Sequence, residues 1–143
     1  MSGLYSFERT EMSFNLIVIH CAATLGDVDA ATIRDWHVND RGWSDIGYHF
    51  VIRKSGDLES GRPLDRPGAH AKGYNDSYGI CLAGGYNGVV DYTAAQWRTL
   101  EGLCKDIIQT EHITRIAGHN ELSSKTCPNF DVVAWSSSFF ENE

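Results

Sequence analysis

The stretch Phe14-Asn15-Leu16-Ile17-Val18-Ile19-His20 is a short run of apolar, largely β-branched residues that ends in a polar side chain. A run of this kind is typical of a buried strand. Similar short segments follow at residues 48–53, 80–83 and 113–117. Residues 54–57 resemble a hairpin turn, so we expect the chain to return along residues 48–53 from Leu58 onwards. These segments are the candidate strands of one sheet.

Helical patterns separate the candidate strands. Residues 29–39 place Ile33 and Trp36 three positions apart on one apolar stripe, and Asp29 is suited to cap the helix. A longer helix opens at Thr93. Its apolar residues recur at intervals of three and four: Trp97, Leu100, Cys104, Ile107 and Ile108. The alternation of strands and helices predicts an α/β fold in which helices flank a central mixed sheet.

Length and composition suit one folded unit. The chain has 143 residues, of which 42% are hydrophobic and 11% aromatic, and this length is typical of a single compact domain. No internal repeat or linker is visible. We therefore expect one domain over residues 1–143, with a core at about 15–135 and a short terminal helix at 131–135.

The charge balance limits the classes of partner. Lys and Arg total 12 against 19 Asp and Glu, which gives a net charge of −7. An acidic chain without a basic stripe disfavours general nucleic-acid binding, and it is not attracted to anionic membrane surfaces. No apolar run is long enough to span a bilayer, and no signal peptide is recognisable. We expect synthesis in a cytoplasm and recognition of the substrate by local chemistry.

Two places in the chain carry candidate metal ligands. His20 ends the first strand, and functional groups of α/β proteins gather at such strand ends. Strand alternation then directs His20 to a cleft and Cys21 to the core. A histidine that simply bonds a carbonyl at the strand end is the alternative. The second place is the polar segment 118–128, which contains His119 and Cys127.

Cys127 differs from the other three cysteines, which lie in apolar runs and are expected to be core residues. A cysteine in a polar loop is more typical of a ligand or a nucleophile. Two imidazoles and a thiolate are suited to Zn²⁺, and three protein ligands leave one coordination position open, as in catalytic sites. The sequence thus suggests one zinc ion per chain, held by His20, His119 and Cys127.

Further polar residues are candidates for catalysis and substrate contact. Lys125 can stabilise a developing oxyanion or be an ordinary surface lysine. Tyr48 can orient water or bond to the intermediate, or be a half-buried sheet tyrosine, and Glu121 is an alternative proton carrier. His70 lies in a glycine-rich loop, where substrate contact and loop hydrogen bonding are both open.

The remaining three histidines have no expected role in the chemistry. His49 should point away from the Tyr48 side of its strand, so we interpret it as structural. His37 and His112 are predicted to face solvent.

Several motifs together resemble the amidase-2 or peptidoglycan-recognition-protein family, and most closely its small phage members. The matching stretches are Ile19-His20-Cys21-Ala22-Ala23-Thr24, Gly42-Trp43-Ser44-Asp45-Ile46-Gly47-Tyr48-His49-Phe50, Gly68-Ala69-His70-Ala71-Lys72-Gly73-Tyr74-Asn75, Gly79-Ile80-Cys81-Leu82 and Lys125-Thr126-Cys127-Pro128-Asn129-Phe130-Asp131. They occur in the order found in the family and extend over roughly residues 15–135. The segment from Asn75 to Ser77 is one residue shorter than in those phage enzymes.

The resemblance implies an N-acetylmuramoyl-L-alanine amidase, an endolysin that cuts peptidoglycan between N-acetylmuramic acid and L-alanine and so lyses the host cell. The zinc ligands of the family correspond to His20, His119 and Cys127, and its catalytic tyrosine and lysine to Tyr48 and Lys125. The expected partner is a muropeptide, and we expect a monomer. The enzyme would be made in the host cytoplasm and act on the wall in the periplasm after release.

Two alternatives accompany the resemblance. Some members of the family hold peptidoglycan without cutting it, and these typically lack the metal-binding cysteine that this chain retains. Some small phage amidases also bind and inhibit the RNA polymerase of the phage, which makes that polymerase a second candidate partner. No docking surface for it is recognisable in the sequence.

Overall fold

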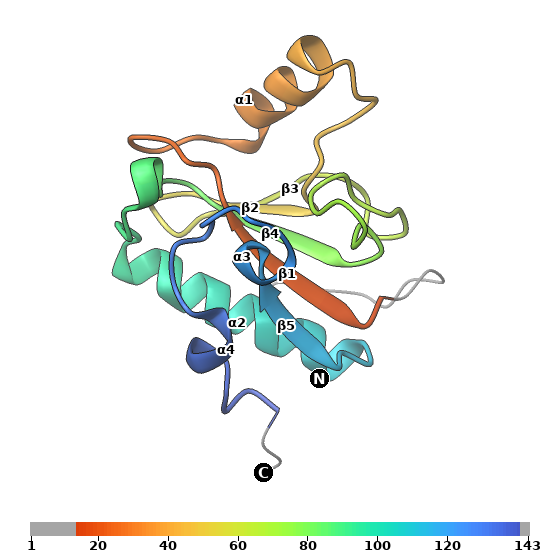
Figure 1. Ribbon diagram of the computed structural model, residues 1–143, viewed down its shortest axis with the longest axis vertical. Helices are drawn as coiled ribbons and strands as arrows, with labels where there is room; N and C mark the ends of the chain where they lie inside the picture. Colours follow the sequence, from red (N-terminus) through yellow and green to blue (C-terminus); the bar gives the residue numbers. More distant parts are fainter. Residues whose placement is uncertain (1–13, 141–143) are drawn as a thin grey trace.

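The computed structural model describes residues 14–140, and its centre is a five-stranded sheet in the order β3-β2-β4-β1-β5 (Figure 1). The strands are β1 (Leu16–Cys21), β2 (Phe50–Ile52), β3 (Leu58–Ser60), β4 (Tyr78–Leu82) and β5 (Arg115–Gly118). β1 runs parallel to both of its neighbours, β4 and β5, whereas β3 is antiparallel to β2. The predicted α/β fold with a mixed sheet is confirmed. A single domain over residues 1–143 stays a prediction, because both ends of that range lie outside the described residues.

The helices alternate with the strands only in part, because β2, β3 and β4 follow one another without a helix between them. The helices are α1 (Ala30–Asp35), the π-helical turn η1 (Trp36–Asp40), the 3-10 turn η2 (Tyr86–Gly88), α2 (Ala94–Thr110), α3 (His119–Leu122) and α4 (Val132–Trp135). α2 begins at the predicted position, because Thr93 Oγ1 accepts the Gln96 N–H at 3.0 Å and Gln96 Oε1 accepts the Thr93 N–H at 2.9 Å. This reciprocal capping box satisfies two backbone donors that would otherwise lack partners.

One face of the sheet packs against α2 and holds most of the core. Ile17 and Ile19 of β1 lie there with Leu100, Leu103 and Ile107 of the helix, all of them at most 1% exposed. Figure 1 shows α2 running along this face. Burial of such side chains is worth about 1.5–3 kcal/mol each, so this layer contributes much of the stability that fixes the sheet.

The other face of the sheet carries a smaller apolar cluster and the polar groups of the site. Its buried residues are Val28, Ile33, Ile46, Val51, Cys81 and Ala83. Because successive strand residues alternate, His20 lies on this face, while Cys21 belongs to the core on the α2 side, as predicted. Trp36, expected on the apolar stripe with Ile33, is instead 37% exposed, because the regular helix ends at Asp35 and a π-helical turn follows.

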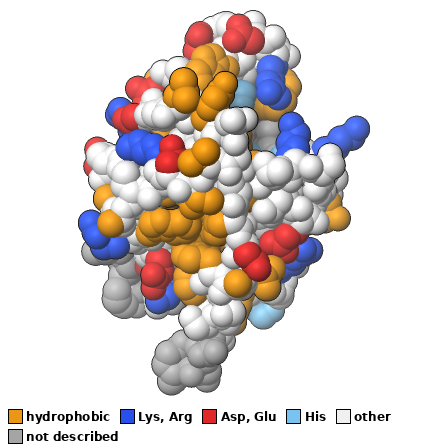
Figure 2. Space-filling model, turned by 60° about the vertical axis from the view of Figure 1, so that its left-hand side comes forward, with side chains coloured by type: hydrophobic (Ala, Val, Ile, Leu, Met, Phe, Trp, Pro, Cys, Tyr) orange, Lys and Arg blue, Asp and Glu red, His pale blue; other side chains and the backbone are white. Residues whose placement is uncertain are grey.

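The surface of the described residues agrees with the charge balance. On the face shown in Figure 2, Lys and Arg side chains are scattered among Asp and Glu around an apolar area, with no continuous basic stripe. Among residues 14–140, no helix combines the length and the apolar character that a bilayer crossing requires.

Candidate metal centre

Three predicted ligands meet at the end of β1. The candidate donor atoms of His20, His119 and Cys127 all lie within 4.8 Å of one another. The pairing of β1 with β5 aligns Ile19 with Gly118. His20 and His119 are the next residues after these two paired positions. Their ring centroids are 4.6 Å apart. Two residues that are 99 positions apart in the sequence are therefore neighbours because two parallel strands end together.

Cys127 reaches the same point from the turn before α4. Its Sγ accepts a hydrogen bond from the backbone N–H of Cys21 at 2.9 Å. The neighbouring Cys21 thiol and burial raise the pKa of the Cys127 thiol above its ordinary value, and the backbone N–H opposes this only in part. Tyr92 donates to the Pro128 carbonyl at 2.8 Å, and Asn129 Nδ2 donates to the Gly85 carbonyl at 3.0 Å. These bonds hold the turn against the sheet. From the sequence we assigned Cys21 only to the core, and nothing in the sequence indicates that its backbone N–H donates a hydrogen bond to Cys127.

The two imidazoles of this cluster are in the protonation state that suits a metal. Burial lowers the pKa of His20 well below its ordinary value, with His70 and His119 as smaller causes. Burial also lowers the pKa of His119, assisted by Lys125. Both imidazoles are therefore neutral at neutral pH, which is the state that binds a metal ion. Two neutral imidazoles and one sulfur on converging elements fit the coordination preferences of Zn²⁺.

The cluster borders a pocket of about 720 Å³, which Tyr48, Lys125 and His70 also line. The ring of Tyr48 is 5.1 Å from that of His20. Burial raises the pKa of the Tyr48 phenol well above its ordinary value, so the phenol keeps its proton. The structure thus brings five of the predicted residues and His70 to one cavity.

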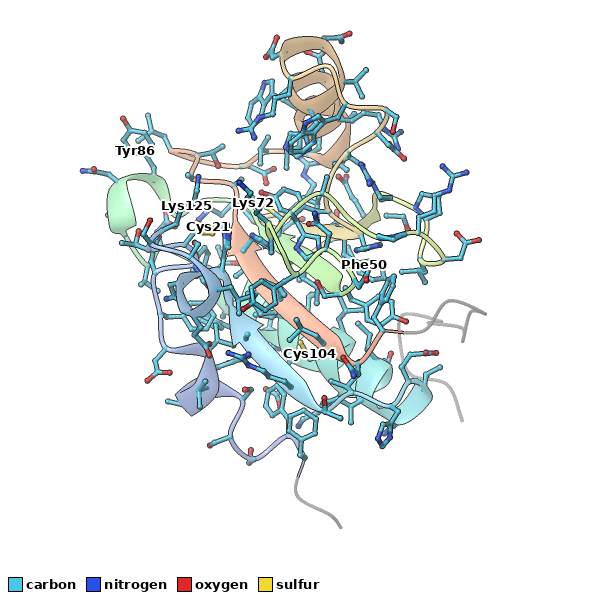
Figure 3. All side chains as sticks on the ribbon, turned by 45° about the vertical axis from the view of Figure 1, so that its right-hand side comes forward. Cys21, Phe50, Lys72, Tyr86, Cys104 and Lys125 are labelled. Atoms are coloured by element: carbon cyan, nitrogen blue, oxygen red, sulfur yellow. The ribbon has the colours of Figure 1, made fainter. Side chains whose placement is uncertain are left out.

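The pocket is positively charged although the protein is acidic. Arg41, Lys72 and Lys125 line it, and none of the described lining residues is Asp or Glu. Figure 3 shows Lys72 and Lys125 at the same end of the sheet as Cys21. Arg41 lies over the ring of Trp43, with 5.2 Å from Cζ to the ring centroid. We did not single out Arg41 or Lys72 from the sequence, where nothing distinguishes them from surface cations.

Glu121 is the one predicted site residue that the structure places elsewhere. Its carboxylate accepts the Gly118 N–H at 2.7 Å and pairs with Arg115 at 3.3 Å, and Glu121 does not line the pocket. It closes the first turn of α3. Glu121 is therefore a capping residue of α3, although it is close to His119 in the sequence.

His37 corrects another expectation. Instead of facing solvent it is 8% exposed and lines the pocket. Its Nδ1 accepts the Gly47 N–H at 2.9 Å, and its ring lies 4.7 Å from that of Trp43. His37 follows Ile33 by four positions, the spacing that places two side chains on one face of a helix, and both side chains are buried.

His49 is buried and structural, as predicted. Its Nδ1 accepts the Gly79 N–H at 3.0 Å, and its Nε2 lies 2.8 Å from the Arg66 carbonyl. His112 is exposed, also as predicted.

His70 lines the pocket, but both of its ring nitrogens already have protein partners. Its Nδ1 is 2.8 Å from His20 Nε2, and its Nε2 is 3.3 Å from the Ser77 carbonyl. Burial is the main cause that lowers the pKa of His70 to about 3, so the ring is neutral. Its contacts are therefore to the ligand His20 and to its own loop.

A family model described as N-acetylmuramoyl-L-alanine amidase, amidase-2, matches residues 10–130. An endolysin of Enterobacteria phage K11 is 40% identical over 124 residues, which cover 82% of each chain.

Among solved structures, an endolysin N-acetylmuramoyl-L-alanine amidase from Clostridium intestinale has a TM-score of 0.79 at 31% identity, covering 88% of this chain and 83% of that one. A complex of two peptidoglycan-recognition-protein ectodomains with tracheal cytotoxin has a TM-score of 0.76 at 25% identity, covering 93% of this chain and 87% of that one. The chain thus belongs to the amidase-2 family of N-acetylmuramoyl-L-alanine amidases, which includes phage endolysins.

Proposed function

We propose that this chain is a zinc-dependent endolysin that hydrolyses the amide bond between N-acetylmuramic acid and L-alanine in peptidoglycan. The observation that carries the proposal is the convergence of His20, His119 and Cys127, whose donor atoms lie within 4.8 Å of one another beside the pocket. Three ligands leave a coordination position for water or substrate, which is the pattern of a catalytic rather than a structural site.

A zinc ion bound there would supply Lewis-acid polarisation of the amide carbonyl and a water acidic enough to ionise near neutral pH. Tyr48 keeps its phenolic proton and can donate a hydrogen bond towards the reacting group. Lys125 lines the same pocket and carries positive charge where oxyanion character develops. His37 Nδ1 accepts a hydrogen bond from the Gly47 N–H, and this bond fixes the backbone just before Tyr48.

The charge of the pocket supports a muropeptide as the substrate. Stem peptides carry free carboxylates, and the pocket offers Arg41, Lys72 and Lys125 without an opposing Asp or Glu among its described lining. The peptidoglycan-recognition-protein structure with a similar fold holds tracheal cytotoxin, a monomeric diaminopimelic acid-type peptidoglycan. We infer that the peptide portion of the substrate lies along this positively charged rim.

Paired variants test the metal and the chemistry separately. Cys127→Ala removes one ligand, so we expect it to lose bound zinc and amidase activity together. Lys125→Ala should keep stoichiometric zinc but lower kcat by about 10²–10³-fold, the usual effect of removing one oxyanion donor. Metal content is measured on the purified proteins, and the cleaved bond is identified by mass spectrometry of the muropeptide products.

Cys104→Ala is the matched control for the ligand variant. Cys104 is fully buried on α2, and Figure 3 shows it well away from Lys125. This variant should keep both zinc and activity. Full zinc stoichiometry in Cys127→Ala would remove that residue from the site, and turnover unaffected by a chelator in the wild type would contradict the role of the metal.

We further propose that the enzyme acts as a monomer on the wall in the periplasm, after release from the host cytoplasm, and that this causes lysis. Permeabilised Gram-negative cells should clear in a turbidity assay, and a chelator should prevent clearing. Binding to the wall without clearing would favour the alternative of a non-catalytic peptidoglycan-binding module. Binding of a phage RNA polymerase stays a prediction, which a pull-down with the cognate polymerase would test.

A further inference from the structure

Given the proposed zinc site, on which this role depends, we infer that His70 is a positioning residue. Its imidazole accepts a hydrogen bond from His20 Nε2 and thereby reserves His20 Nδ1 for the metal. His70 would thus act through His20 and not by touching the substrate, although it lines the same pocket.

A chain of hydrogen bonds assigns the protons. Ser77 Oγ donates to the Tyr74 carbonyl at 2.5 Å, so towards His70 Nε2, at 3.2 Å, this hydroxyl offers only its lone pairs. The Ser77 carbonyl, 3.3 Å from the same nitrogen, can only accept. His70 must therefore carry its proton on Nε2.

The same logic extends to His20. A neutral imidazole with a proton on Nε2 has a lone pair on Nδ1. At 2.8 Å from that lone pair, His20 Nε2 must be the donor, which leaves His20 Nδ1 unprotonated and free to bind a metal. Metal-bound histidines usually donate their second N–H to a carboxylate, a carbonyl or water, and this partner fixes the tautomer and the ring orientation. Here a second imidazole takes that position.

The space for the His70 ring is formed by two glycines. A Cβ placed on Gly79 of β4 would lie 2.7–2.8 Å from three atoms of the ring, and one placed on Gly68 would overlap its Cδ2 and lie 3.0 Å from its Nε2. Contacts this short are essentially never observed for real Cβ atoms, so the ring occupies room that only glycine leaves. The ring also packs edge-on against His20 at 86° and a centroid distance of 4.8 Å.

The backbone of His70 is held as firmly as its ring. Asn75 Oδ1 accepts the N–H groups of both His70 and Ala71 at 2.9 Å, and the Gly68 N–H donates to the Asn75 carbonyl at 2.9 Å. The loop is therefore closed on itself around the imidazole. A side chain with fixed backbone, ring plane and tautomer is suited to orienting a ligand and poorly suited to following a mobile substrate.

Two amide variants separate the two nitrogens of His70. In His70→Asn the side-chain oxygen stands near the place of Nδ1 and can still accept from His20. In His70→Gln the amide reaches towards the place of Nε2 and leaves His20 without its acceptor. Zinc dissociation constants are measured by competition with a chelating dye. We expect His70→Gln to weaken zinc binding 10–100-fold, as outer-shell losses commonly do, and His70→Asn to recover most of that loss.

Ser77→Ala is the matched control, because it removes the hydroxyl but keeps the carbonyl that fixes the tautomer. It should bind zinc nearly as the wild type does. Cobalt(II)-substituted protein adds a spectroscopic measure, since the ligand-field bands of His70→Gln should shift while those of His70→Asn should resemble the wild type. Wild-type zinc affinity in both amide variants would overturn the positioning role.

A third measurement needs no metal and separates this inference from the proposed function. Long-range ¹H–¹⁵N correlation spectra of the metal-free protein should show both His20 and His70 as Nε2–H tautomers. A proton on His70 Nδ1 would overturn the inference even if the wild type binds zinc. Failure of the wild type to bind zinc, with both tautomers as expected, would instead count against the proposed function and leave His70 without a metal ligand to orient.

Discussion

Side chains around the pocket divide into two groups by what they contact. His20, His37 and His70 have ring nitrogens that bond to other protein groups, so they are fixed before any substrate arrives. Arg41 and Lys72 are exposed, and neither forms an ion pair with a carboxylate among the described residues. The first group builds the site, and the second is available to bind an anionic ligand.

At the scale of single residues, Arg41→Gln and Lys72→Gln should each raise KM for a muropeptide about 2–5-fold with little change in kcat. An exposed ion pair is worth up to about 1 kcal/mol, and it contributes equally to the ground state and the transition state. Steady-state kinetics at low and high salt provide the measurement, since added salt should narrow the difference from the wild type.

Lys105→Gln is the control for these variants, because Lys105 is an exposed residue of α2 that pairs with Glu101 at 2.6 Å. Its kinetics should be unchanged. A fall in kcat at constant KM in Arg41→Gln or Lys72→Gln would place that residue in the chemistry instead.

At the scale of elements, the parallel pairing of β4 and β1 determines what can lie beside the metal ligands. The register aligns Gly79 with Val18 and Cys81 with His20, so the site-facing positions of β4 border the ligand strand directly. A glycine at 79 leaves the space that the His70 ring fills. Because Gly79 has no side chain, β4 leaves room for the His70 ring beside the strand that carries His20.

Gly79→Ala should displace the His70 ring and weaken zinc binding in the same direction as His70→Gln. The new methyl group would meet the ring at 2.7–2.8 Å, and the His49 bond to the Gly79 N–H also limits movement of the strand. Overpacking of this kind typically costs about 1–3 kcal/mol of stability. Zinc affinity and the melting temperature of the metal-free protein are the two measurements.

Gly26→Ala is the matched control, because nothing lies within 4 Å of a Cβ placed there. It should leave both quantities near those of the wild type. Unchanged zinc affinity in Gly79→Ala would show that the His70 ring is not held by this contact.

At the scale of the whole molecule, buried neutral histidines make stability depend on pH. Burial is the first cause that lowers the pKa values of His20, His49 and His70 below the ordinary 6.5. As the pH falls through about 6.5, these histidines bind protons in the unfolded chain but not in the folded chain, so the free energy of unfolding falls. For His70 the loss continues down to its folded pKa of about 3.

Urea unfolding of the metal-free protein should therefore show stability falling between pH 6.5 and 5, by about 1 kcal/mol for each buried histidine over the first unit. His70→Asn should reduce the slope by one proton, while His112→Gln, at an exposed position, should leave it unchanged. A flat profile in the wild type would contradict the neutral state of the buried rings.

The sequence by itself determined the α/β class, the helix that opens at Thr93 and the set of candidate ligands. These depend on local physics: short apolar runs form strands, apolar spacing of three and four forms helices, and a cysteine in a polar loop stands out from cysteines in apolar runs. The resemblance in ordered motifs then indicated Tyr48 and Lys125, for which single residues left the alternatives open.

Only the tertiary structure decided which candidates share the pocket. Glu121 is close to His119 in sequence but is used in capping α3, and His37 turns inward, where its Nδ1 accepts the Gly47 N–H. The contact between His20 and His70 joins residues 50 positions apart, through space that Gly79 leaves open on a neighbouring strand. Strand register and missing side chains act between distant segments, and no local pattern in the sequence encodes them.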